Sequence, residues 1–316
     1  MAITGIDQVC FGVDDLPRCR DFFRDWGLES VSDGETGDDW ATLNGSIVSL
    51  RPIDDPALPA AFEDGNTIRE IIWGVDSVAD LDHLRPVLSE TPGFDEQDGT
   101  LRGTDPNGLS VAFRVTRTRD VDIEPSETNS WGRVRRVDTP STVYERAQPI
   151  EIGHAVLFTN NLEAAGAFYR SIGFHLSDEY PGRGQFLRCA ERGGHHDLFL
   201  LETPQGRHGL NHLAFTVRDI HEIFGGGLHM SRCGWDTQLG PGRHPISSAY
   251  FWYFHNPAGG LIEYYSDEDY LTENWTPRAI EPGPTKFAEW AISGGLDGNS
   301  RRQRQAGDVN RAFLTE

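Results

Sequence analysis

Apolar and polar residues alternate along two distant stretches of the chain in the pattern of a β-strand followed by an amphipathic helix. Residues 3–29 and residues 149–175 each begin with an alternating apolar run, pass through a short polar turn and then place apolar positions at helical spacing. Each predicted helix ends at a glycine, Gly27 or Gly173, because glycine readily adopts the left-handed conformation that follows a helix. The two stretches therefore indicate an internal repeat.

A second pair of similar stretches lies downstream of the first pair. Residues 69–88 and residues 210–228 each predict a strand, a short turn and a helix, and an apolar hairpin follows each of them. The hairpins contain the turn sequences DPNG at residues 105–108 and NPAG at residues 256–259. We therefore expect an α+β fold of four βαβββ modules that are paired into two similar domains.

A polar segment without a periodic apolar pattern separates the two halves. Residues 119–142 contain proline and few apolar residues, which is typical of a linker. We therefore expect an N-terminal domain over residues 1–140 and a C-terminal domain over residues 141–276. Residues 277–316 are rich in Gly and Arg, and we expect them to form a C-terminal extension that ends in a short helix.

The charge of the chain excludes two classes of partner. The 316 residues include 28 basic and 49 acidic side chains, which gives a net charge of −21. Such a surface repels nucleic acid and anionic membranes, so we expect neither as a partner. No apolar run is long enough to span a bilayer, the N-terminus lacks a signal-peptide pattern and the four cysteines show no CxxC pairing. These features predict a cytoplasmic protein.

Histidine is concentrated in the second half of the chain. Ten of the 11 histidines lie between His154 and His255. This stretch is therefore the candidate for metal binding or proton transfer. Lysine is nearly absent, since Lys286 is the single one, so amine catalysis has one candidate residue.

Alignment of the four modules brings three of the second-half residues into one set. His154 and His212 fall on the first strands of the third and fourth modules, and Glu263 falls on the last strand of the fourth. Two histidines and one carboxylate leave open positions on a metal, as in the facial triad of non-haem Fe(II) oxygenases. The residues at the corresponding first-half positions are Gln8, Glu70 and Ala112. We therefore expect the metal site in the second half alone.

Two stretches of this half resemble the type I extradiol ring-cleaving dioxygenases of the vicinal oxygen chelate superfamily. The more specific stretch is GPGRHPISSAYFWYFHNPAGGLIEYY at residues 240–265, and the other is RCAERGGHHDLFLL at residues 188–201. In layout the resemblance covers about residues 3–270. It implies the vicinal oxygen chelate (glyoxalase-like) fold and an enzyme that cleaves the ring of a vicinal aromatic diol with O₂. It also implies a homo-oligomer.

The resemblance assigns roles to individual residues. His154, His212 and Glu263 are similar to the family's metal ligands for Fe(II), for which Mn(II) is the alternative. His244 and Tyr253 are similar to residues that hydrogen-bond the substrate oxygens.

A further histidine of this family acts as the acid/base. His196 fits this position, and His195 is the alternative shifted by one residue. A histidine there can hydrogen-bond bound oxygen and donate a proton when the O–O bond breaks.

Val156, Leu239 and Arg243 are the residues that we expect at the substrate pocket. Some family members that cleave acidic catechols carry an asparagine and an arginine at two positions that are Val156 and Leu239 in this chain. This difference favours a substrate with an apolar or neutral ring substituent. Arg243 or Arg278 is the alternative source of a positive charge in the pocket.

Two other functions on the same fold stay open. A glyoxalase-like or epimerase-like enzyme would use the metal to stabilise an enediolate, and such sites usually draw an additional carboxylate ligand from another module. Glu70 is the candidate for that ligand. A ligand-sequestering protein that is not an enzyme would not need an intact set of metal ligands.

Overall fold

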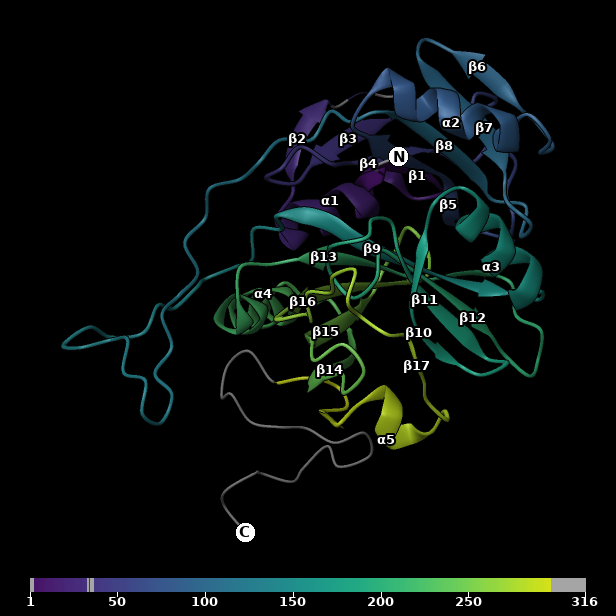
Figure 1. Ribbon diagram of the computed structural model, residues 1–316. Coiled ribbons are helices and arrows are strands. Elements are labelled where there is room, and N and C mark those ends of the chain that lie inside the picture. Colours follow the sequence, from purple (N-terminus) through teal and green to yellow (C-terminus); the bar gives the residue numbers. More distant parts are fainter. Residues whose placement is uncertain (1–2, 33, 35–36, 297–316) are drawn as a thin grey trace.

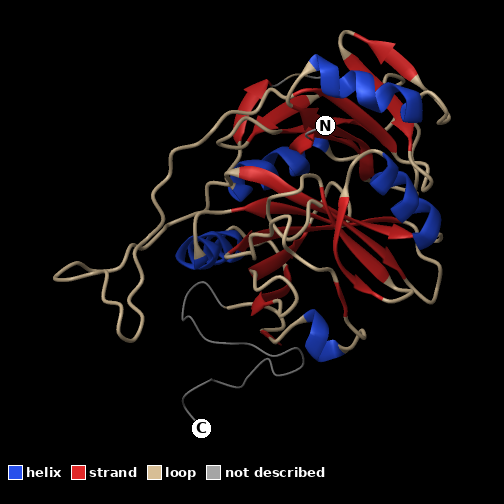
Figure 2. Cartoon of the chain, viewed as in Figure 1, coloured by secondary structure: helices blue, strands red, loops and turns tan. Residues whose placement is uncertain are grey.

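The strands form two mixed sheets, one from each half of the chain (Figure 1). The computed structural model describes residues 3–32, 34 and 37–296. Within these residues the element order repeats β, α, β, β, β four times, which confirms the predicted α+β fold with four βαβββ modules. Figure 2 shows the helices, in blue, packed beside the strands of the two sheets, in red. None of the described helices is both long and apolar enough to cross a membrane.

The first half forms an eight-stranded sheet with the order β2-β3-β4-β1-β5-β8-β7-β6. Its first module consists of β1 (Ile3–Val13), α1 (Leu16–Trp26), β2 (Glu29–Ser32), β3 (Asp38–Ala41) and β4 (Ile47–Pro52). Its second module consists of β5 (Thr67–Val75), α2 (Val78–Leu88), β6 (Asp95–Gln97), β7 (Thr100–Thr104) and β8 (Ser110–Val115). The first strands of the two modules, β1 and β5, pair antiparallel at the centre of the sheet.

The second half repeats this arrangement in a ten-stranded sheet with the order β17-β10-β11-β12-β9-β13-β16-β15-β14-β18. The third module consists of β9 (Glu151–Thr159), α3 (Leu162–Ser171), β10 (His175–Tyr180), β11 (Gly184–Arg188) and β12 (Leu198–Glu202). The fourth consists of β13 (Gly209–Thr216), α4 (Ile220–Arg232), β14 (Thr237–Arg243), β15 (Tyr250–His255) and β16 (Leu261–Ser266).

The C-terminal extension adds a strand at each edge of the second sheet. These strands are β17 (Arg278–Ala279) and β18 (Trp290–Ala291), with the short helix α5 (Pro284–Phe287) between them. The helix expected at the end of the extension falls within residues 297–316, outside the described residues.

Local sequence signals set the ends of the first helix. The Asp15 carboxylate accepts a hydrogen bond from the backbone N–H of Arg18 at the start of α1. The helix ends at Gly27 with φ of 104°, as the sequence predicts. A Cβ at Gly27 would lie 2.2 Å from the carbonyl oxygen of Ala147, so glycine is also needed for the chain to approach the second half.

One aromatic pair joins the two halves. Trp26 at the end of α1 stacks on Tyr264 of β16, with ring centroids 3.5 Å apart and an interplanar angle of 6°. The Tyr264 hydroxyl donates a hydrogen bond of 2.6 Å to the Trp26 carbonyl. Both rings are fully buried, so this contact fixes β16 against the first half.

The strands β13 and β16 direct successive side chains to opposite faces of the second sheet. On β13, Leu213 and Phe215 belong to the main hydrophobic core, whereas His212 and Ala214 point to the opposite face. On β16, Tyr264 belongs to the core and Glu263 does not. His212 and Glu263 therefore lie on the face of the second sheet that points away from the core.

Candidate active site

Strand register brings the three predicted metal ligands together. The strands β9, β13 and β16 are neighbours in the second sheet, and Ala214 on β13 lies opposite both His154 on β9 and Glu263 on β16. His212 lies two residues before Ala214 and therefore shares its face. Because Ala214 has only a methyl side chain, His154 and Glu263 can reach each other across it.

The ligand atoms converge on one point. His154 Nε2 lies 3.2 Å from Glu263 Oε2, His212 Nε2 lies 3.1 Å from the same oxygen, and the two nitrogens are 3.3 Å apart. Two neighbouring ligands of an octahedral ion, each about 2.1 Å from it, lie about 3 Å apart. Glu263 Oε2 is buried without a hydrogen bond of good geometry. The three residues therefore fit a divalent metal ion held on one face.

Burial and the contacts among these groups together set their protonation states. Burial lowers the pKa of His154 to about 3 and, aided by the neighbouring histidines, also lowers the pKa of His212. Burial alone would raise the pKa of Glu263, but the close histidines outweigh it and hold this pKa well below its usual range. Neutral imidazoles and an ionised carboxylate are the forms that bind a metal.

His244 and Tyr253 form the wall beside Glu263. His244 Nδ1 donates a hydrogen bond of 2.7 Å to the Phe287 carbonyl, so Nε2 of the neutral ring carries the lone pair. The Tyr253 hydroxyl donates to this Nε2 at 2.9 Å, and Nε2 lies 3.6 Å from Glu263 Oε1. Burial raises the pKa of Tyr253 well above its usual value, so the phenol stays protonated.

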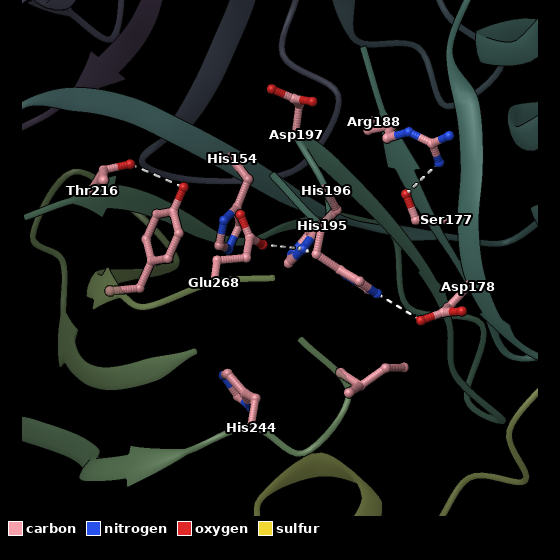
Figure 3. A network of polar contacts seen from close by, with 12 residues as sticks. His154, Ser177, Asp178, Arg188, His195, His196, Asp197, Thr216, His244 and Glu268 are labelled. Carbon is pink, nitrogen blue, oxygen red and sulfur yellow. Dashed lines mark hydrogen bonds and ion pairs between the residues drawn. The ribbon is translucent and has the colours of Figure 1, made fainter. Parts of the chain in front are cut away.

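The two neighbouring histidines point in different directions (Figure 3). The His196 ring lies against the His154 ring, with centroids 4.2 Å apart, and it lines the cavity above the ligands. His195 is fully buried and reaches Asp178 instead. Of the two candidates for the acid/base, His196 is therefore the one that faces the site. On its other side, His196 Nδ1 lies 3.1 Å from Glu268 Oε1.

An ion pair behind His195, between the buried Asp178 and the partly exposed Arg278, has no counterpart in the sequence-based predictions. His195 Nε2 lies 2.7 Å from Asp178 Oδ2, and the Arg278 guanidinium pairs with the same carboxylate. Burial alone would raise the pKa of Asp178, but these hydrogen bonds lower it. Asp178 and Arg278 are 100 residues apart in the chain, and no sequence signal connects them.

An apolar cavity of about 350 Å³ opens above the ligands. Val156 and Leu239 line it, together with the aromatic pair Phe186 and Phe199, whose ring centroids lie 3.9 Å apart in a stacked arrangement. The remaining aliphatic and aromatic lining residues include Tyr180, Leu201, Ile246, Ala249, Leu261 and Phe287.

The basic residues near the cavity are placed differently from the expectation. Arg243 is not among the lining residues, since its guanidinium pairs with Glu289 and lies 5.7 Å from the Tyr250 ring. Arg278 is held by Asp178. Arg183 lines the cavity instead, and the sequence offered no motif that singled it out.

The first half holds no equivalent set of ligands among its described residues. Glu70, at the position equivalent to His212, pairs with Arg102 at 3.1 Å and accepts a hydrogen bond from Ser110. The Gln8 amide, at the position of His154, donates to Ser49. Both side chains are thus hydrogen-bonded within the first half, and Glu70 is not a ligand of the second-half site.

Two comparisons by sequence identify similar proteins. A profile of the Glyoxalase/Bleomycin resistance protein/Dioxygenase superfamily matches residues 151–264. Metapyrocatechase 2 of Cupriavidus necator is 29% identical over 186 residues, which are 58% of this chain and 57% of that protein. The chain thus matches less than two thirds of this relative's length.

Comparison by structure extends the likeness to nearly the whole chain. The Mn(II)-bound glyoxalase from Novosphingobium aromaticivorans has a TM-score of 0.74 at 25% identity and covers 93% of both chains. Homoprotocatechuate 2,3-dioxygenase from Arthrobacter globiformis has a TM-score of 0.69 at 18% identity, over 92% of this chain and 88% of that one. These likenesses confirm the predicted vicinal oxygen chelate fold.

Proposed function

We propose that this chain, whose residues 151–264 match the profile of the Glyoxalase/Bleomycin resistance protein/Dioxygenase superfamily, is an extradiol dioxygenase. It would cleave the ring of a vicinal aromatic diol next to the two hydroxyls, and both atoms of O₂ would enter the product. The observation that carries this proposal is the convergence of His154, His212 and Glu263 at the floor of an apolar cavity. The similarity to metapyrocatechase 2 supports the same class of reaction.

In this proposal His154, His212 and Glu263 hold Fe(II), with Mn(II) as the alternative because the ligand preferences of the two ions overlap. When bound, the ion would bring diol and O₂ together and supply the redox chemistry of their reaction. Three protein ligands leave positions free for both reactants. The apolar lining, including Val156 and Leu239, would hold the ring and exclude water, which favours a diol with an apolar or neutral substituent.

The remaining polar residues would handle protons. The Tyr253 hydroxyl donates to His244 Nε2 in the structure. A bound diol would take the place of this contact, so that Nε2 could accept a proton from a substrate hydroxyl while Tyr253 donates to the same substrate oxygen. His196 lies on the other side of His154 and can donate a proton as the O–O bond breaks. The substrate thus loses its proton on one side of the site and oxygen receives one on the other.

A glyoxalase-like activity is the second candidate. The Mn(II)-bound glyoxalase neighbour covers 93% of both chains, and Glu268 supplies a carboxylate close to His154. Such an enzyme would isomerise its substrate through an enediolate and would consume no O₂.

The test is anaerobic loading with Fe(II), followed by a screen of catechols for O₂ uptake and for the yellow ring-fission product. We expect uptake with diols that carry apolar substituents. No uptake with any vicinal diol by the iron-loaded protein would contradict the dioxygenase proposal, and isomerisation of a hemithioacetal would then favour the second candidate.

Two variants assign the roles within this assay. His154→Ala should lose bound iron, because it removes one of three ligands. His196→Ala should keep the iron and lose turnover, because His196 is outside the ligand set. His83→Ala, which changes an exposed histidine on α2, is the matched control. Full turnover by His196→Ala would contradict its role.

A further inference from the structure

The segment that links the two halves extends away from both sheets (Figure 1). Residues 127–143 contain no helix or strand, and all of them are exposed except Arg136 and Ser141, which are half-buried. We call residues 127–143 the arm. A connection between two packed halves does not need such an excursion, so the arm requires an explanation of its own.

The two ends of the arm are fixed to the second half. The Ser126 backbone N–H donates a hydrogen bond of 2.8 Å to Asp219, the residue that caps the start of α4. The side chains of Ser126 and Tyr144 are also hydrogen-bonded to each other at 2.7 Å. The base of the arm is therefore closed by one small polar cluster, and the arm projects from it.

The arm also has a defined internal structure. Asn129 Oδ1 accepts hydrogen bonds from the backbone N–H groups of Arg135 and Arg136, at 2.8 and 2.7 Å. Ser130 and Arg133 pair in a tight turn through two backbone hydrogen bonds. Within the part of the chain that the structure describes, the hydrogen bonds found for the arm join its own residues. The arm thus has a hydrogen-bonded turn of its own.

The arm presents large apolar side chains to solvent. Trp131 is fully exposed, with 103% of its reference surface accessible, and Val134, Val137 and Val143 are exposed by 66% to 73%. Isolated exposed apolar residues are common, but a fully exposed tryptophan beside three valines in one segment is the composition of an interaction site. Tryptophan and arginine are also the residue types most enriched among those that dominate binding energy.

Charge indicates which surface the arm fits. Residues 129–137 include Arg133, Arg135 and Arg136 and no acidic residue, whereas the whole chain has a net charge of −21. Glu127 and Asp138 flank this stretch, so the whole arm carries three basic and two acidic side chains. Its central stretch, residues 129–137, is the basic and apolar part that projects from an acidic molecule. A second copy of the same chain offers the acidic surface that complements it. Exchange between two copies is reciprocal, so each copy both donates and receives an arm.

We propose that residues 127–143 dock on the acidic body of a second copy of this chain, with Trp131 as the apolar anchor and the three arginines as the complementary charges. This inference does not depend on the proposed enzyme activity. It assigns the contact that would hold a homo-oligomer to the linking segment.

Sedimentation velocity with light scattering tests the proposal. The wild-type chain is expected at a multiple of 35.2 kDa, and Trp131→Ser is expected to shift it to a smaller species. Replacing Arg133, Arg135 and Arg136 together by Glu should have the same effect, and high salt should weaken the wild-type assembly. Because the arm lies outside the body, both variants should keep the wild-type circular dichroism spectrum.

The matched control is Val78→Ser, which removes a valine that is 64% exposed at the start of α2, far from the arm in the sequence. It should leave the assembly unchanged, and Trp131→Phe should retain it. A monomeric wild-type chain would overturn the proposal. So would an assembly that Trp131→Ser leaves intact, or one that Val78→Ser disrupts equally.

Discussion

His195 Nε2 lies 2.7 Å from Asp178 Oδ2, and both side chains are completely buried. The hydrogen bond to the ionised carboxylate places the proton of His195 on Nε2 and the lone pair on Nδ1. This Nδ1 lies 3.3 Å from Nδ1 of His196. Asp178 therefore fixes the ring of His195, and His195 in turn faces the ring that lines the candidate active site.

Asp178→Asn should lower kcat by about 10- to 100-fold while the iron content stays at the wild-type level, since groups that orient catalytic residues have effects of this size. The reason is that the amide N–H of asparagine can donate to His195 Nε2, which would move the proton of the His195 ring to Nδ1. His195 Nδ1 could then no longer accept a hydrogen bond from His196. The measurement is kcat for ring cleavage together with metal analysis.

Ser177→Ala is the control for this change, because Ser177 is the buried neighbour of Asp178 and contacts Arg188 rather than His195. It should retain the wild-type kcat. Equal activity of Asp178→Asn and the wild type would show that His196 is held by other contacts, such as that with Glu268.

Ala214→Leu should abolish metal binding. Ala214 lies between His154 and Glu263 on the neighbouring strands, and it is fully buried. A leucine would occupy the space across which these two ligands meet, and small-to-large changes in packed sites force neighbours apart. Isothermal titration with Mn²⁺ checks this.

Ala112→Leu is the matched control for that prediction. Ala112 is also fully buried, but it lies in the first-half sheet, at the position equivalent to Glu263. This variant carries a similar packing penalty and should bind Mn²⁺ as the wild type does. Tight binding by Ala214→Leu would show that the three residues do not act as one ligand set.

The fold and the grouping of the three candidate ligands could be predicted because both depend on periodic signals. The repeat of four modules placed His154 and His212 on the first strands of the third and fourth modules and Glu263 on the last strand of the fourth, and these strands are neighbours in the sheet. Asp178 could not be found in this way, because its partner Arg278 lies 100 residues away in the C-terminal extension. Contacts of this kind depend on how that extension folds over the sheet.

The position of Arg243 shows a second limit of prediction from the sequence, since a shift in strand register cannot be seen in the apolar pattern. Leu239 and Arg243 are four residues apart on β14, so a regular strand would point both side chains to one face. The register against β15 shifts between Leu239 and Gly242, which adds one residue on β14. Such a bulge turns the following side chains to the other face, and Arg243 faces Glu289 rather than the cavity.

Trp26→Ala should lower the free energy of unfolding by about 3–5 kcal/mol, the usual cost of removing a large buried aromatic side chain. The stacked ring of Tyr264 would then border a cavity between the two halves. Chemical denaturation measures the loss. Phe94→Ala, at a residue that is 36% exposed, should cost far less, and a similar loss in both variants would contradict the role of the stacked pair.

The buried carboxyl of Asp197 should make the stability of the fold depend on pH. Burial raises the pKa of its carboxyl from 3.8 to about 6 in the folded chain, even though the Cys189 backbone N–H donates to it at 2.7 Å. The folded state thus binds this proton more tightly than the unfolded state does. Ionisation of Asp197 therefore lowers the free energy of unfolding. This loss is absent below pH 3.8, grows as the pH rises, and is complete above about pH 6. A shift of this size corresponds to a change on the order of 3 kcal/mol.

Asp197→Asn tests this sign, because an amide keeps the shape of the side chain and does not ionise. The free energy of unfolding of this variant should therefore rise relative to the wild type between pH 4 and pH 7, as measured by urea denaturation at several pH values. Asp7→Asn serves as the contrast, since the Asp7 carboxylate is buried but paired with Arg114 at 3.1 Å. It should lose stability at pH 7, where an unpaired Arg114 would remain. If Asp197→Asn followed the wild-type curve in parallel, the Asp197 carboxyl would not be the titrating group.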